Sequence, residues 1–320
     1  MASSEALSGK AKNNISRSVI NLRIYYNYTI MREIPKWLKD MVAKNKAAYH
    51  TSAAKKTQEN LDLKLLPTVC QEARCPNRGE CFCHGEATIM ILGSLCTRAC
   101  KYCAVSKAKP LPPAGDEPAR AAQLVQAQSI KYLVLTMPTR DDLPDGGAHH
   151  IHNVVKAVKE KNPLCLVEPL ISDLGGKFEH LPLIIESGCD VLGHNIETVP
   201  SLFKAVRPGA SYGRSLDLLK KAKEIKPSLI TKSGVMVGLG ESDAELKQTF
   251  KDLRLCGVEL LTLGQYLAPS ALHYPVQSYP EPAWYEDMTS YCLSIGFKGV
   301  MGGPLVRSSY RAAELYRRAQ

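Results

Sequence analysis

The sequence contains no apolar run of the ~18 residues that a membrane-spanning helix needs, and no secretory signal is recognisable in it. Its cysteines are eleven in number, which is odd, and they are spread over 320 residues. Small secreted proteins held together by disulfides are short and pair their cysteines evenly, so this pattern argues against a disulfide framework. We therefore predict no membrane segment, and cysteines that serve chemistry rather than cross-linking.

Six of the eleven cysteines lie within 34 residues, in two groups of three. The first group has the spacing C-x4-C-x5-C and the second C-x3-C-x2-C; their members are Cys70, Cys75 and Cys81, then Cys96, Cys100 and Cys103. Thiolate sulfur is a soft ligand that favours zinc, copper(I) or iron–sulfur clusters. Because each group is one ligand short of four, the pattern indicates metal centres with an open or unusual fourth position.

The second group suits a cubane iron–sulfur cluster in which three irons have cysteine ligands and the fourth is open, as catalysis requires. Zinc is the alternative, but zinc sites mostly use paired C-x2-C units or histidines at set spacing. The nearest upstream histidine, His84, lies 12 residues before Cys96, which is not such a spacing. The spacing therefore favours iron–sulfur over zinc.

With Tyr102 directly before its last cysteine, the second group resembles the C-x3-C-x-aromatic-C motif of the radical S-adenosylmethionine (SAM) enzymes. In that family SAM chelates the open iron of a 4Fe–4S cluster and is cleaved to a 5′-deoxyadenosyl radical, and the aromatic residue packs near the adenine. The resemblance implies that Cys96, Cys100 and Cys103 bind this cluster and that Tyr102 contacts SAM.

Two further motifs resemble those of the lipoyl synthases. Residues 70–81 are similar to that family's auxiliary-cluster motif, and residues 307–310 match its R-S-S-Y motif. Other segments match in order from about Trp37 to Tyr310. In the family a serine of R-S-S-Y is the fourth ligand of the auxiliary cluster; by alignment this is Ser309, with Ser308 as the alternative. The resemblance thus implies a second 4Fe–4S cluster, held by Cys70, Cys75, Cys81 and Ser309, with Arg307 stabilising the cluster edge or the serine.

Two polar residues and two divergent segments are further candidates for the active site. Asn195 and Glu197 follow a predicted strand and are candidates for polar contacts with SAM, although such residues can also serve only to order a loop. Segments 137–139 and 169–175 depart from the family pattern and are expected to face the active site from strand ends.

Five cysteines lie outside the two groups. Cys83, an extra cysteine next to the first group, is predicted to be a small, partly buried side chain. The others lie in apolar runs and are predicted to be core residues: Cys165, Cys189, Cys256 and Cys292.

The family resemblance implies a sulfurtransferase that inserts two sulfur atoms, at C6 and C8 of an octanoyl chain on a carrier-domain lysine, with the auxiliary cluster as sulfur donor. It implies as partners octanoylated lipoyl domains (2-oxoacid dehydrogenase E2 subunits and the glycine cleavage H protein), an electron donor such as ferredoxin or flavodoxin, and iron–sulfur cluster carriers. Neither nucleic acid nor membrane is expected as a partner.

Three alternatives remain open at this point. One is another radical SAM sulfur-inserting enzyme, similar to biotin synthase or a methylthiotransferase; the R-S-S-Y motif and the N-terminal position of the first cysteine group argue against it. A second is an iron–sulfur electron carrier, but ferredoxins are short and complete their clusters with cysteine. The third is a zinc-stabilised nucleic-acid-binding protein.

Apolar runs and helical patterns alternate along the chain. Strands are predicted at 87–93, 131–136, 164–168, 189–194, 229–237 and 258–264, and helices at 116–129, 149–161, 178–187, 212–225 and 242–255. Such alternation predicts an α/β fold with a parallel sheet, here a partial (β/α)6 TIM-type barrel of the radical SAM kind with N- and C-terminal extensions covering the barrel mouth. The alternative fold is an open doubly wound sheet. It typically has a glycine-rich phosphate-binding loop after the first strand, where this chain has cysteines.

We divide the chain into a basic, partly disordered N-terminal arm (1–60), an auxiliary-cluster segment (61–86), the barrel (87–300) and a C-terminal extension (301–320). The arm holds 11 Lys and Arg against 4 Asp and Glu, which is +7 of the total +10. It could steer an acidic carrier, bind nucleic acid or only solubilise the chain. Its serines and basic residues are also typical of a mitochondrial transit peptide, so a cytoplasmic location is predicted with the mitochondrial matrix as the alternative.

Overall fold

The computed structural model describes residues 33–64, 66–84 and 87–320. Its centre is one sheet of seven parallel strands, in the order β1-β4-β5-β6-β7-β8-β9. The strands are β1 (Thr88–Met90), β4 (Tyr132–Thr136), β5 (Leu166–Leu170), β6 (Val191–Gly193), β7 (Ile230–Val237), β8 (Leu260–Gln265) and β9 (Gly299–Gly303). The predicted α/β fold is confirmed, and the sheet has one strand, β9, that was not predicted.

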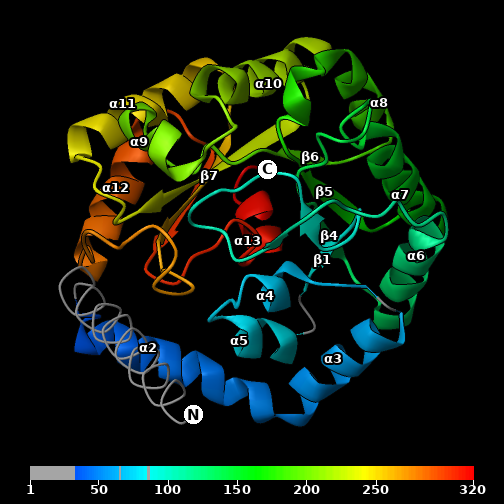
Figure 1. Cartoon of the computed structure of the whole chain (residues 1–320), viewed down its shortest axis with the longest axis horizontal. Coiled ribbons are helices and arrows are strands. Elements are labelled where there is room, and N and C mark those ends of the chain that lie inside the picture. Colours follow the sequence, from blue (N-terminus) through cyan, green and yellow to red (C-terminus); the bar gives the residue numbers. More distant parts are fainter. Residues whose placement is uncertain (1–32, 65, 85–86) are drawn as a thin grey trace, which may run out of the picture.

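Helices connect the strands and cover the outside of the sheet, as parallel pairing requires (Figure 1). They are α6 (Glu117–Gln128), α7 (Ala148–Lys161), α8 (Leu181–Glu186), α9 (Pro200–Val206), α10 (Tyr212–Ile225), α11 (Asp243–Leu255) and α12 (Pro282–Ser294), with short 3-10 turns at η2 (Leu174–Gly176) and η3 (Phe178–His180). Helix α11 begins with a capping box. The Ser242 hydroxyl accepts a hydrogen bond from the backbone N–H of Glu245, and the Glu245 carboxylate accepts one from the Ser242 N–H.

The sheet is not closed by hydrogen bonds, because β1 and β9 are its two edges. Figure 1 shows the N-terminal segment lying between these two edges, where it completes the ring. That segment comprises α2 (Lys36–Ala47), η1 (Ala48–His50), α3 (Ser52–Leu63), α4 (Val69–Glu72) and α5 (Arg78–Cys83). Within it Leu38 and Leu61 are buried, and Thr68 forms an antiparallel bridge with Ile89 of β1. The part of the predicted basic arm from 33 to 60 is thus largely helical, whereas residues 1–32, including the transit-peptide feature, lie outside the described residues.

The C-terminal extension contacts both ends of the barrel. After β9, residues 306–309 pass along the C-terminal ends of the strands. Helix α13 (Ala312–Arg317) then lies against the opposite end, where the ring of Tyr316 is 5.8 Å from that of Tyr132, the first residue of β4. Within the C-terminal extension, the part at the mouth is therefore the R-S-S-Y segment and not the final helix, and residues of the stretch 69–76 in the N-terminal segment also line the mouth.

A buried polar cluster fills the interior of the barrel. The Lys232 ammonium lies 2.7 Å from one oxygen of Glu168 and 3.0 Å from the other, and the Tyr132 hydroxyl donates to Glu168 at 2.6 Å. These charges are paired and hydrogen-bonded, as burial demands. No helix among the described residues is long and apolar enough to cross a membrane.

Candidate active site

A cavity of about 580 Å³ lies at the C-terminal ends of the strands, where β/α barrels place their chemistry. It is lined by residues of both cysteine groups together with the R-S-S-Y segment. Of the predicted site residues, those on its wall are Cys70, Cys75, Cys96, Cys100, Tyr102, Cys103, Asn195, Glu197, Arg307 and Ser309. Cys81 lies on α5 outside this lining.

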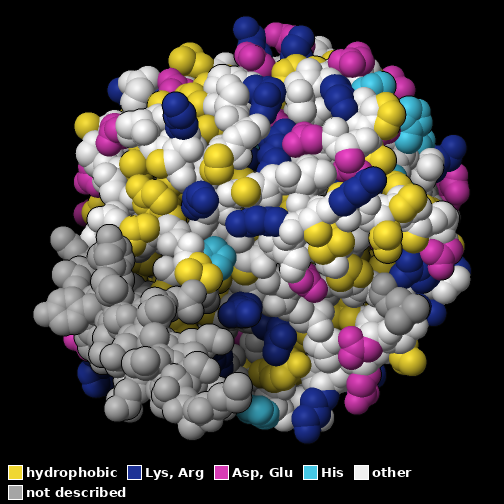
Figure 2. Space-filling view, viewed as in Figure 1, with side chains coloured by type: hydrophobic (Ala, Val, Ile, Leu, Met, Phe, Trp, Pro, Cys, Tyr) yellow, Lys and Arg dark blue, Asp and Glu magenta, His cyan; other side chains and the backbone are white. Residues whose placement is uncertain are grey.

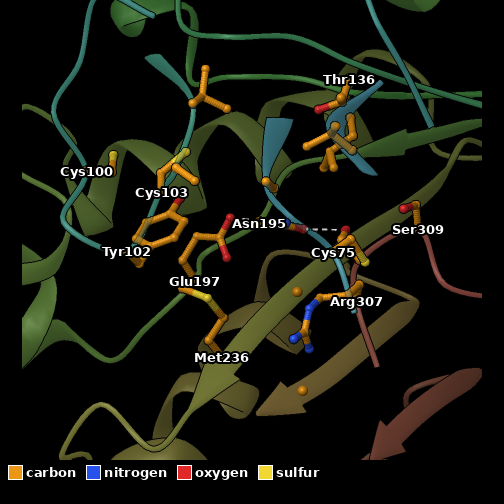
Figure 3. Close-up of a pocket in the computed structure, with 18 of the residues that line it drawn as sticks. Cys75, Cys100, Tyr102, Cys103, Thr136, Asn195, Glu197, Met236, Arg307 and Ser309 are labelled. Atoms are coloured by element: carbon orange, nitrogen blue, oxygen red, sulfur yellow. Dashed lines mark hydrogen bonds between the residues drawn. The ribbon is translucent and has the colours of Figure 1, made fainter. Parts of the chain in front are cut away.

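The two groups face one another across the cavity. Figure 3 shows Cys100, Tyr102 and Cys103 on one side, and Cys75, Arg307 and Ser309 on the other. Asn195 lies between them. Segments that are far apart in sequence therefore converge because each follows the C-terminal end of a strand or fills the gap between the two sheet edges.

The loop of the second cysteine group includes the short strand β2 (Leu95–Cys96), which pairs with β3 (Ser106–Lys107), and it is held by a buried arginine. Arg98 donates to both oxygens of Asp141, at 2.7 and 2.8 Å, and lies 2.7 Å from Asp173. Arg214 binds the second oxygen of Asp173 at 2.6 Å. These pairs fasten the loop to the segments that follow β4 and β5 and to α10. Sequence reasoning gave none of these charged residues a role.

On the same side, Tyr102 and Glu197 lie next to each other (Figure 3). Burial raises the pKa of both groups, and for Glu197 the nearby Arg207 and hydrogen bonds from Asn195 and Tyr102 oppose the rise. The backbone of Glu197 has φ of 69°, which is uncommon for a residue other than glycine and typical of functional sites. Gly234 makes room for this turn, because a Cβ there would lie 2.8 Å from the Asn195 amide oxygen.

Two buried polar atoms on the wall have no hydrogen-bond partner among the described residues. One is Nε of Arg207, a guanidinium that donates to the carbonyls of Asn195 and Ile196 but forms no ion pair there. The other is Nε2 of His194, whose Nδ1 is 2.9 Å from the carbonyl of Ile171. Unsatisfied buried groups of this kind indicate a missing polar ligand. Neither residue is predicted as a site residue from the sequence.

On the other side of the cavity the two serines differ. The Ser308 hydroxyl donates to the Asn195 amide oxygen at 2.9 Å, whereas the Ser309 hydroxyl makes no hydrogen bond with the described residues and lines the cavity. Arg307 is half-buried close to Cys75 and donates to the carbonyls of Gln265 and Val306. Ser309 is thus the uncommitted hydroxyl of the pair.

The donor set fits iron–sulfur clusters. Burial raises the pKa of Cys70 and of Cys103 to about 11, so these thiols stay protonated until a cation displaces the proton. Within the described ranges no three Cys, His, Asp or Glu side chains are grouped so that they could hold a single metal ion. Each cysteine of a cubane cluster ligates a different iron, so such a cluster does not require that grouping.

Comparison with known proteins identifies the family. A family model described as "Radical SAM superfamily" matches residues 90–253. A curated lipoyl synthase of Caldicellulosiruptor bescii is 49% identical over 254 residues, covering 79% of this chain and 87% of the relative. That of Chloroflexus aggregans is 46% identical over 278 residues, covering 87% and 89%.

The chain belongs to the lipoyl synthases, within the radical SAM superfamily. It is therefore an enzyme, a radical SAM sulfurtransferase. Membership of the superfamily implies a 4Fe–4S cluster and SAM, and lipoyl synthase activity implies an octanoylated carrier as substrate.

Solved structures support the fold assignment. The crystal structure of Streptococcus suis SuiB bound to S-adenosylmethionine superposes with a TM-score of 0.53 at 12% identity, covering 68% of this chain and 50% of that one. A second SuiB structure gives 0.52 at 12% identity, covering 71% and 53%. At this identity the likeness concerns the fold alone.

The two segments that depart from the lipoyl synthase pattern both reach the site. Residues 137–139 line the cavity, and the carbonyl of Thr139 accepts from Thr97 in the cysteine loop. Residues 170–172 also line it, and Asp173 is the partner of Arg98 described above.

The cysteines outside the two groups lie away from the cavity lining. Cys83 is half-buried, and its sulfur contacts the Thr51 hydroxyl at 2.9 Å and the Ala48 carbonyl at 3.1 Å. Three of the four predicted core cysteines are buried, but Cys256 is only half-buried because it caps the end of α11 at the surface.

Proposed function

We propose that this lipoyl synthase inserts sulfur at C6 and C8 of an octanoyl chain that is amide-linked to a lysine of a carrier domain. The observation that carries the proposal is that five of the six cysteines of the two groups, together with Ser309, line one cavity. A substrate chain that enters this cavity meets both groups at once, so hydrogen removal and sulfur delivery can take place on the same carbon.

On one side, we assign Cys96, Cys100 and Cys103 to the SAM-binding 4Fe–4S cluster. We assign the guanidinium of Arg207 to the SAM carboxylate, because its buried Nε has no hydrogen-bond partner among the described residues. Asn195, Glu197 and Tyr102 are then left for the ribose and adenine. When bound, the two clusters and SAM supply a primary carbon radical and sulfide, which the protein itself cannot provide.

On the other side, we assign Cys70, Cys75, Cys81 and Ser309 to the auxiliary cluster. Ser309 is preferred over Ser308 because its hydroxyl is uncommitted, whereas Ser308 donates to Asn195. The positive charge of Arg307 next to Cys75 would offset the negative charge of thiolate ligands.

Between the two sides the wall is suited to an alkyl chain. The lining includes five large apolar side chains, those of Met90, Leu170, Val235, Met236 and Leu267. Burying methylene groups against such side chains is favourable, and it excludes the water that would otherwise compete for reactive species.

We propose an acidic carrier domain as the macromolecular substrate, of the kind found in 2-oxoacid dehydrogenase E2 subunits and the glycine cleavage H protein. Lys46 and Arg74 line the cavity, are exposed, and form no ion pair with a described residue. Figure 2 shows Lys and Arg side chains near the centre of the face in view as well as at its edge. We further propose a ferredoxin or flavodoxin as electron donor, iron–sulfur carriers for cluster supply, and the reducing cytoplasm as the compartment.

The test is an anaerobic turnover of the reconstituted protein with SAM, a reductant and an octanoyl-lysyl peptide, read by mass spectrometry. A peptide with two added sulfurs and accompanying 5′-deoxyadenosine supports the proposal. Cys75→Ala is expected to form 5′-deoxyadenosine without sulfur insertion, while the matched control Cys83→Ala retains both. Deoxyadenosine without sulfur from the unaltered protein would contradict the assignment of substrate.

A further inference from the structure

Glu80, on α5, receives two hydrogen bonds from the C-terminal segment. The Tyr310 hydroxyl donates to its Oε1 at 2.8 Å, and Arg311 Nη2 donates to the same oxygen at 3.2 Å. Glu80 directly precedes Cys81, and Tyr310 directly follows Ser309. The contact therefore joins the immediate neighbours of two assigned cluster ligands, across 230 positions of sequence.

A second attachment lies upstream of the serines. The side-chain amide of Asn77, which is buried, donates to the carbonyl of Leu305, and the Asn77 oxygen accepts from Asn45 of α2 at 3.0 Å. The serine segment is thus fastened on both sides to residues 77–80, and the stretch between the attachments is the part that carries the serines.

The chain conformation at the downstream attachment is unusual. Arg311 has φ of 46°, in the left-handed region that residues other than glycine seldom adopt. It follows Tyr310 and precedes α13, so this turn directs the chain away from the cavity. The hydrogen bonds that Glu80 accepts from Tyr310 and Arg311 hold the turn in this conformation.

We propose that Glu80 and Tyr310 are positioning residues that hold the Ser309 hydroxyl at the auxiliary cluster. This inference rests on the proposed function, in which Ser309 is the fourth ligand of that cluster. A serine hydroxyl is a poor iron ligand beside thiolates, and the Ser309 hydroxyl has no hydrogen bond within the described part of the chain to orient it. Its position is therefore set by the residues around it, as is usual for groups that support metal ligands.

The test uses a parent chain that can hold only the auxiliary cluster, with alanine at Cys96, Cys100 and Cys103. Tyr310→Phe and Glu80→Ala are made in this parent and reconstituted anaerobically with iron and sulfide. Because loss of such a supporting contact typically weakens metal binding by about 10-fold or more, we expect iron release to a chelator to become about 10-fold faster. Glu80→Gln is expected to have a smaller effect, since its amide oxygen can still accept from Tyr310.

The matched control is Tyr316→Phe, in the same C-terminal extension but packed against Tyr132 and without contact to Glu80. It is expected to release iron at the parent's rate. Equal release rates in Tyr310→Phe, Glu80→Ala and the parent would overturn the positioning role.

Hydrogen exchange of the cluster-free variants gives a second measurement. Faster exchange confined to residues 305–311 is expected in Tyr310→Phe, and unchanged exchange there would contradict the inference. A parent chain that binds no cluster at all would overturn the auxiliary site itself, and with it the proposed function. That result is visible before the Tyr310 and Glu80 variants are made.

Discussion

The guanidinium of Arg98 and the carboxylate of Asp173 lie 2.7 Å apart, and both side chains are buried. Arg98 is the middle residue between Cys96 and Cys100, so this ion pair fixes the cysteine loop against the segment that follows β5. Asp173 is in turn bound by Arg214, and together these contacts lower its pKa well below its usual range despite burial. The loop is thus held in place by the protein alone.

Asp173→Asn should destabilise the metal-free protein by about 3 kcal/mol, because it leaves two arginines without their buried anion. Asp141→Asn is the matched control: its carboxylate also binds Arg98 but is 39% exposed, so a loss of about 1 kcal/mol or less is expected. Urea unfolding measures both. Equal losses would contradict the role given to Asp173.

His194 should make stability depend on pH. Burial lowers its pKa from 6.5 to about 4, so between these values the unfolded chain binds the proton more readily than the folded one. The contribution of His194 is therefore complete above pH 6.5 and is lost as pH falls towards 4, by up to about 1.4 kcal/mol per pH unit. The difference in unfolding free energy between the parent and His194→Asn should follow this slope, and parallel pH profiles would refute it.

Arg207→Lys should weaken SAM binding by about 10- to 100-fold, since one or two charge-assisted hydrogen bonds to the carboxylate are lost. Equilibrium dialysis with the reconstituted enzyme measures the affinity directly. Lys204→Met, which removes an exposed cation from the same region, is expected to leave it unchanged. An unaltered affinity in Arg207→Lys would show that the carboxylate binds elsewhere.

Reversing the charges at the opening of the cavity should raise KM for a carrier domain but not for a short peptide substrate. Lys46→Glu with Arg74→Glu is expected to raise KM for an octanoylated carrier domain about 10-fold at low salt, with KM for an octanoyl-lysyl tripeptide unchanged. Lys161→Glu, at the end of α7, serves as the control. A similar rise for both substrates, or for the control, would mean that these cations do not recognise the carrier.

Much of this architecture is predictable from sequence, because the six predicted strands and five helices carry apolar periodicity and clear ends. Strand β9 is not, since it is five residues long and three of them are glycine, which hides the pattern. The cysteine spacing and the R-S-S-Y motif predict the proposed ligands. Their supporting contacts, such as Glu80 with Tyr310, depend on how distant segments pack, and no local pattern encodes that.

The role of Arg98 illustrates the same limit. In sequence it is one of 41 Lys and Arg residues, and only the fold brings Asp141 and Asp173 to it from two other loops. Likewise Ser308 and Ser309 are indistinguishable in sequence apart from alignment, and the hydrogen bond of Ser308 to Asn195 separates them.

We propose that both inserted sulfur atoms come from iron–sulfur clusters bound by this protein, and the Cys75→Ala variant above tests their assignment to the auxiliary cluster. The most direct measurement reconstitutes the enzyme with sulfide labelled with a heavy sulfur isotope, removes free sulfide, and runs a single turnover on an octanoyl-lysyl peptide. The account predicts a product in which both inserted sulfurs carry the label. A product with only unlabelled sulfur would contradict it.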